Sequence, residues 1–66
     1  MTVTAYDRRE VRFIKKCIEN AKRQLWLIEG AGSPDLEARS LWVRVYLEEA
    51  VKRAGNMERR AARRAA

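Results

Sequence analysis

Residues 30–56 read GAGSPDLEARSLWVRVYLEEAVKRAGN, and helix-breaking residues at both ends of this stretch divide the chain. The first break runs from Gly30 to Pro34, and the second is the pair Gly55-Asn56. Each break follows a segment rich in Glu, Arg, Lys, Leu and Ala, which are strong helix formers. Because Gly suits the left-handed position just after a helix, we predict three helices, at about residues 5–29, 34–54 and 57–66.

Polar residues that cap helices stand at the expected boundaries. Thr4, followed three residues later by Asp7, resembles a capping box at the start of the first helix. Ser33 can cap the second helix, and Pro34 suits its first turn. Asn56 can cap the third helix. These signals agree with the division into three helices.

Apolar residues recur three and four positions apart in the first two helices, as expected for a packed face. In the first helix this row holds Val11, Ile14, Ile18, Ala21, Leu25 and Ile28. In the second helix it holds Leu36, Val43, Leu47, Ala50, Val51 and Ala54. The rows predict an antiparallel helical hairpin with Ile18 and Leu47 in its core. With the short third helix at one end, we expect an all-α fold, a small three-helix bundle in a single domain of residues 1–66.

The composition limits how such a domain can be stabilised. The 66 residues include one Cys and no His, so the chain can form neither an internal disulfide nor a common structural zinc site. There are 15 Lys and Arg against 9 Asp and Glu, a net charge of +6. The excess is concentrated in residues 52–66. That segment is interpreted either as an arginine-rich, phosphate-binding helix or as a solvated terminal helix. It holds no aromatic residue that could stack on a base, which weakens the nucleic-acid interpretation.

Several function classes lack the residues they need. No long uncharged run that could span a membrane is present, nor is the apolar core of a signal peptide, and the localisation stays open. Cys17 has no His to activate it, and Glu48 and Glu49 point about 100° apart on a helix. The loop at Gly30 lacks the preceding strand and the Lys of a phosphate-binding loop. We therefore expect no enzyme, no cofactor and no metal site.

Large apolar residues remain outside the predicted core rows. On the second helix Leu41, Val45 and Ala38 lie opposite its row, and Trp42 and Tyr46 flank it, as members either of a broader core or of an interface. The first helix has a second, neutral row and a tryptophan on its charged face. The predicted protein-binding residues are Ala38, Leu41, Trp42, Val45, Tyr46, Phe13, Leu27 and Trp26.

Two segments resemble a class of engineered proteins. They are GSPDLEA at residues 32–38 and EEAVKRAGN at residues 48–56. Over residues 30–66 the chain resembles computationally designed helical mini-proteins and designed helical-repeat proteins, in which short loops of Gly, Ser, Asn and Pro join helices of Glu, Arg, Lys, Ala and Leu. The resemblance implies a binder with a protein target, without catalytic or cofactor-binding residues.

Three functions are compatible with these features. The leading hypothesis is a protein-binding module, a helical mini-binder that presents an apolar and aromatic helix face to a protein partner. The first alternative is a helix-hairpin homo-oligomer that completes a four-helix bundle by self-association. The second is a basic nucleic-acid-binding peptide that uses the C-terminal arginines. We expect no membrane partner.

Overall fold

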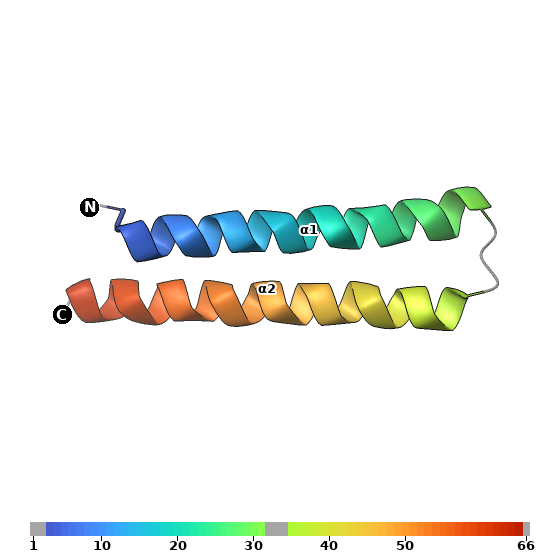
Figure 1. Ribbon diagram of the computed structural model, residues 1–66. Helices are drawn as coiled ribbons and strands as arrows, with labels where there is room; N and C mark the ends of the chain where they lie inside the picture. Colours follow the sequence, from blue (N-terminus) through green and yellow to red (C-terminus); the bar gives the residue numbers. More distant parts are fainter. Residues whose placement is uncertain (1–2, 32–34, 66) are drawn as a thin grey trace.

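The structure is a computed structural model that describes residues 3–31 and 35–65, and it is a hairpin of two long helices (Figure 1). Helix α1 spans Ala5–Ala31 and helix α2 spans Leu36–Ala65. The helices lie antiparallel, so that the beginning of α1 and the end of α2 share one end of the molecule. The hairpin is a rod whose Cα atoms extend over 50 × 15 × 12 Å.

The start of α1 confirms the predicted capping box. The Thr4 backbone N–H donates to Asp7 Oδ2 at 3.2 Å, and the Asp7 backbone N–H donates to Thr4 Oγ1 at 3.1 Å. At its other end α1 continues through Gly30 to Ala31, so the prediction that Gly30 follows the helix is wrong. The predicted cap at Ser33 and the predicted first-turn Pro34 lie outside the described residues.

The predicted third helix does not exist as a separate element, and the three-helix bundle is a wrong prediction. Helix α2 passes without a break through Gly55 and Asn56 and ends at Ala65. A glycine inside a helix costs only about 1 kcal/mol relative to Ala. A continuous helix also brings Arg60 and Arg64 to Asp7, at 3.5 and 3.0 Å. Contacts with α1 therefore extend along α2 well beyond Gly55.

The residues that face the opposite helix form a narrow strip, which we call the seam. In α1 the seam holds Asp7, Glu10, Ile14, Cys17, Ala21, Gln24 and Ile28. In α2 it holds Arg39, Val43, Tyr46, Ala50, Arg53, Met57, Arg60 and Arg64. The alternating spacing of three and four is that of a coiled coil. Among the described apolar residues only Cys17, Ala21 and Ala50 are buried, so this core is small.

The predicted core rows are correct at some positions and wrong at others. Ile14, Ala21, Ile28, Val43 and Ala50 lie in the seam. The other large residues of these rows are at least 39% exposed, namely Val11, Ile18, Leu25, Leu36, Leu47 and Val51. Ala54 is exposed as well. The physical reason is that one neighbouring helix covers only a narrow strip, whereas the apolar rows are broad enough to contact two. The prediction that Ile18 and Leu47 lie in the core is therefore wrong.

Candidate protein-binding faces

The hairpin has two different long sides, one on each side of the seam. Both helices are right-handed and run in opposite directions, so the residues one position after a seam residue lie on the same side in both. That side carries Val11, Ile18, Leu25, Leu47 and Val51, and we call it the aliphatic side. The opposite side carries Phe13, Trp42, Val45 and Tyr46, and we call it the aromatic side.

The aromatic side forms a shallow groove between the helices. Phe13, Cys17 and Asn20 of α1 line it together with Val45, Tyr46 and Glu49 of α2. The Trp42 and Tyr46 rings are tilted by 31°, with centroids 5.9 Å apart. Phe13 is 40% exposed and Trp42 is 51% exposed, whereas Tyr46 is half-buried in the seam. The structure thus brings four of the predicted binding residues together.

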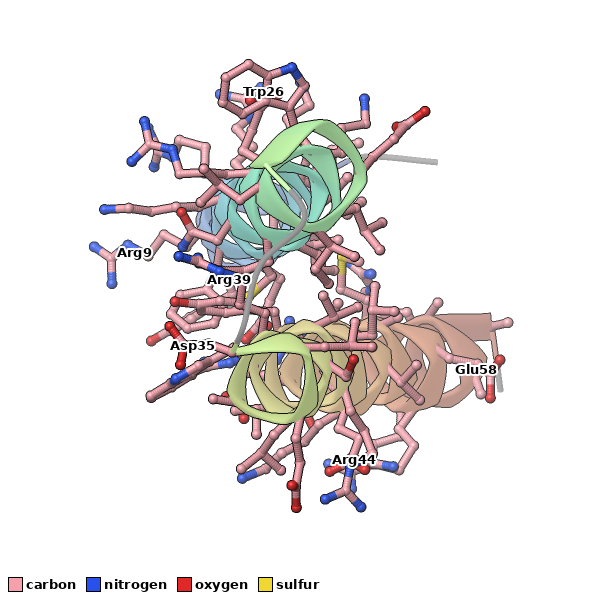
Figure 2. All side chains as sticks on the ribbon, turned by 90° about the vertical axis from the view of Figure 1, so that its right-hand side faces the viewer. Arg9, Trp26, Asp35, Arg39, Arg44 and Glu58 are labelled. Carbon is pink, nitrogen blue, oxygen red and sulfur yellow. The ribbon has the colours of Figure 1, made fainter. Side chains whose placement is uncertain are left out.

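The other four predicted binding residues do not line this groove. Leu27 is half-buried, one position before a seam residue and so on the aromatic side, and Ala38 is exposed on the first turns of α2. Leu41 falls on the part of α2 that faces away from α1. Trp26 is 69% exposed and points away from α2 (Figure 2). Its surroundings are Glu19, Asn20, Lys22 and Arg23, so Trp26 is separate from the aromatic side.

Positive charge borders the aromatic side. Arg9, Lys16 and Arg23 are exposed on α1 and repeat every seven residues along one edge. Arg9 extends away from both helices on the same side as Arg39 (Figure 2). Within the groove the Arg53 guanidinium carbon lies 4.2 Å from the Phe13 ring centroid, a cation–π contact.

Side chains that could add negative charge to the groove already have partners. Glu49 Oε1 accepts a hydrogen bond from Arg53 Nε at 3.3 Å. On the same side Arg39 Nη1 donates to Gln24 Oε1 at 3.0 Å, which links the two helices near the loop. The groove is thus apolar at its floor and basic along its α1 edge.

The open end of the hairpin holds five charged side chains that sequence reasoning did not group. Arg60 lies 3.5 Å from Asp7 and 3.9 Å from Glu10. Arg64 lies 3.0 Å from Asp7, and Arg53 lies 3.7 Å from Glu10. We call these residues the terminal ion cluster. Three of the C-terminal arginines therefore contact carboxylates of α1 while their side chains stay 33–39% exposed. The sequence does carry a signal for this cluster, because all five residues follow the three-and-four spacing of the seam.

The terminal ion cluster is buried at its centre. Asp7 is only 7% exposed. The backbone N–H of Thr4 lowers the pKa of the Asp7 carboxyl, and the side chains of Arg64 and Thr4 lower it further against the opposing effect of burial. Among the described residues, Asp7 Oδ1, Glu10 Oε2 and two nitrogens of Arg60 are buried without a hydrogen-bond partner. Such a cluster fixes which residues pair but adds little net stability.

The described residues contain few groups that could carry out chemistry. Cys17 is 5% exposed, and within residues 3–31 and 35–65 no group of three His, Cys, Asp or Glu side chains lies close enough to bind a metal ion. Neither of the two described helices has an apolar stretch long enough to cross a membrane.

Comparison with known proteins adds no assignment to these surfaces. No family model, curated protein or solved structure matches the chain.

Proposed function

We propose that the chain is a protein-binding module whose aromatic side binds an apolar segment of another protein. The observation that carries this proposal is the exposed groove lined by Phe13, Val45 and Tyr46, with the Trp42 ring beside Tyr46. Aromatic residues and Arg are the residue types that most often dominate binding energy at protein interfaces. An exposed aromatic cluster of this kind contributes little to the stability of a hairpin whose helices pack through the seam.

The groove is preorganised, which favours binding. Tyr46 is held in the seam and supports the Trp42 ring, and Arg53 lies over Phe13. All these residues belong to helices rather than to the connecting segment. Because their side chains are already positioned, less conformational entropy is lost when a partner binds.

The charges around the groove define the partner. Arg9, Lys16 and Arg23 border it on α1, and the whole chain carries a net charge of +6. A partner that places apolar residues in the groove and carboxylates beside these cations would be matched in both respects. The proposed partner is therefore an acidic amphipathic protein segment. A protein partner is favoured over nucleic acid because Arg53, Arg60 and Arg64 are engaged by carboxylates of α1.

Fluorescence anisotropy with two labelled amphipathic peptides tests this proposal. Both peptides carry the same leucine face, but one has glutamate and the other lysine at the flanking positions. We expect saturable binding of the glutamate peptide only. Trp42→Ala should weaken that binding by about 30-fold, the size expected for an interface hot spot.

The matched controls separate binding from folding. Val51→Ala changes an exposed residue on the aliphatic side and should leave peptide affinity unchanged. Circular dichroism should show the same helix content for Trp42→Ala as for the wild type. Equal binding of both peptides, or wild-type affinity in Trp42→Ala, would contradict the proposal.

A further inference from the structure

We infer that Arg53 couples the terminal ion cluster to the groove of the aromatic side. Its ion pair with Glu10 holds the guanidinium over the Phe13 ring, and the held ring favours binding in the groove. Arg53 is thus a positioning residue for the proposed function, on which the effect on binding rests. The hold of Arg53 on Phe13 itself needs no partner.

Arg53 belongs to the terminal ion cluster and also contacts the groove. On its own helix, Arg53 Nε donates to Glu49 Oε1 at 3.3 Å, and Glu49 lines the groove. Across the seam, Arg53 Nη1 lies 3.7 Å from Glu10 Oε1, and its guanidinium carbon lies 4.2 Å from the Phe13 ring centroid. Two carboxylates, one from each helix, therefore fix the guanidinium beside an aromatic ring of the groove.

The ion pair with Glu10 is the one that directs the guanidinium onto α1. Glu10 and Phe13 are three residues apart on α1, so they are neighbours on its surface. Glu49 is four residues before Arg53 on α2, and an ion pair within one helix does not draw the side chain towards the other. When Glu10 loses its charge, Arg53 keeps the pair with Glu49, and the guanidinium should spend less time over Phe13.

The burial of Glu10 makes this ion pair more effective than one on the surface. The Glu10 side chain is 12% exposed and the Arg53 side chain is 35% exposed. Salt screens partly buried pairs much less than exposed pairs. Among the described residues Glu10 Oε2 has no hydrogen-bond partner, so the carboxylate depends on the cations near Oε1. These are Arg53 at 3.7 Å and Arg60 at 3.9 Å.

A held Phe13 ring matters because it forms part of the groove wall. Phe13 is the aromatic residue that α1 contributes to the groove lining. Arg53 lies over the ring, yet Phe13 remains 40% exposed and accessible to a partner. Fixing a mobile side chain on binding costs affinity, and a ring that is already held has less freedom to lose. Loss of the hold should therefore weaken binding about threefold.

Fluorine NMR tests the hold without a partner. Phe13 is the single phenylalanine of the chain, so incorporation of para-fluorophenylalanine gives one resonance. Arg53→Gln removes the guanidinium and should shift this resonance. Glu10→Gln should shift it in the same direction. In the double variant, Glu10→Gln should add little to the shift caused by Arg53→Gln, because Glu10 acts through Arg53.

Asp7→Asn is the matched control. Like Glu10→Gln, it replaces a carboxylate of the terminal ion cluster by the amide of the same size. The ion pairs of Asp7 are with Arg60 and Arg64, so the contact of Arg53 with Phe13 stays intact. We expect the Asp7→Asn resonance at the wild-type position.

Peptide binding tests the consequence, and its sign is the readout. Glu10→Gln and Asp7→Asn each raise the net charge of the chain by one, so an effect of charge alone would strengthen binding of the glutamate peptide in both. Coupling through Arg53 predicts instead that Glu10→Gln weakens binding about threefold and that Asp7→Asn does not weaken it. Circular dichroism should show wild-type helix content in both variants.

The outcomes separate this inference from the proposed function. A Phe13 resonance that stays in place in Glu10→Gln, or that moves equally in Asp7→Asn, would overturn the coupling. Unchanged or stronger peptide binding by Glu10→Gln would overturn the effect on the groove. A wild-type chain that binds neither peptide would contradict the proposed function, whereas the fluorine resonance would still show whether Glu10 holds Arg53 over Phe13.

Discussion

The seam between α1 and α2 is built differently at its middle and at its open end. In the middle the buried residues are small, namely Cys17, Ala21 and Ala50. At the open end the same positions carry the terminal ion cluster. Small side chains allow close approach of the helices but bury little apolar area. Buried ion pairs specify the register but contribute little net stability. The seam thus fixes the geometry of the hairpin, whereas many of the large apolar residues lie outside it and stay exposed.

The largest effect should come from a charge placed in the middle of the seam. Ala21 is 3% exposed, and Ala21→Glu would leave an uncompensated charge between the helices. We expect a loss of about 3–5 kcal/mol in the free energy of unfolding and an unfolded chain by circular dichroism. Lys22→Glu, one position further along on the exposed surface, is the control and should stay helical. A folded Ala21→Glu variant would show that the middle is not tightly packed.

At the open end the expected loss is smaller. Arg60→Met removes the side chain that contacts both Asp7 and Glu10, while it keeps an apolar stem of similar length. Because two buried carboxylates then lose a partner, we expect the free energy of unfolding, measured with urea, to decrease by about 1–2 kcal/mol. Arg63→Met alters a neighbouring exposed arginine and should change stability little. If both variants unfold at the same urea concentration, the ion cluster contributes nothing.

Acid should weaken the open end and spare the middle. The pKa of Asp7 is lowered in the folded state, so its contribution to stability is complete above its unfolded value, near pH 3.9, and is lost as the pH falls through the folded value. The melting temperature should therefore drop between about pH 4 and pH 2. The melting temperature of Asp7→Asn should depend less on pH over this range. The same pH dependence for the variant and the wild type would contradict the role assigned to Asp7.

The sequence was sufficient to predict local features of the fold. The capping box at Thr4 and the all-helical character of the chain follow from side chains that act within one or two turns. It was insufficient to place the seam, because Ile18 and Leu47 continue apolar rows that are wider than one neighbouring helix can cover. The continuity of α2 also depends on contacts between residues far apart in the sequence, such as Arg64 with Asp7.

The same reasoning applies to the candidate site. Trp42, Tyr46 and Val45 are four residues apart or fewer on one helix, so periodicity alone placed them near each other. That Phe13 joins them, and that Trp26 does not, depends on how α1 is rotated against α2. Periodicity within one helix does not determine how α1 is rotated relative to α2. That rotation is set by the small residues and the ion pairs of the seam.

The smallest expected effect is that of Gly55→Ala, and its sign is the informative result. Gly55 lies inside α2, where an added Cβ would meet only the Arg59 Nη1 atom, at an ordinary contact distance of 3.4 Å. Gly55→Ala should therefore stabilise the protein by about 0.4–1 kcal/mol, because alanine restricts the unfolded chain without straining the helix. Urea unfolding measures this gain. If α2 ended at residue 54 and Gly55 took the left-handed position after it, the same substitution would destabilise the protein. The sign of the change thus decides between one continuous helix and two.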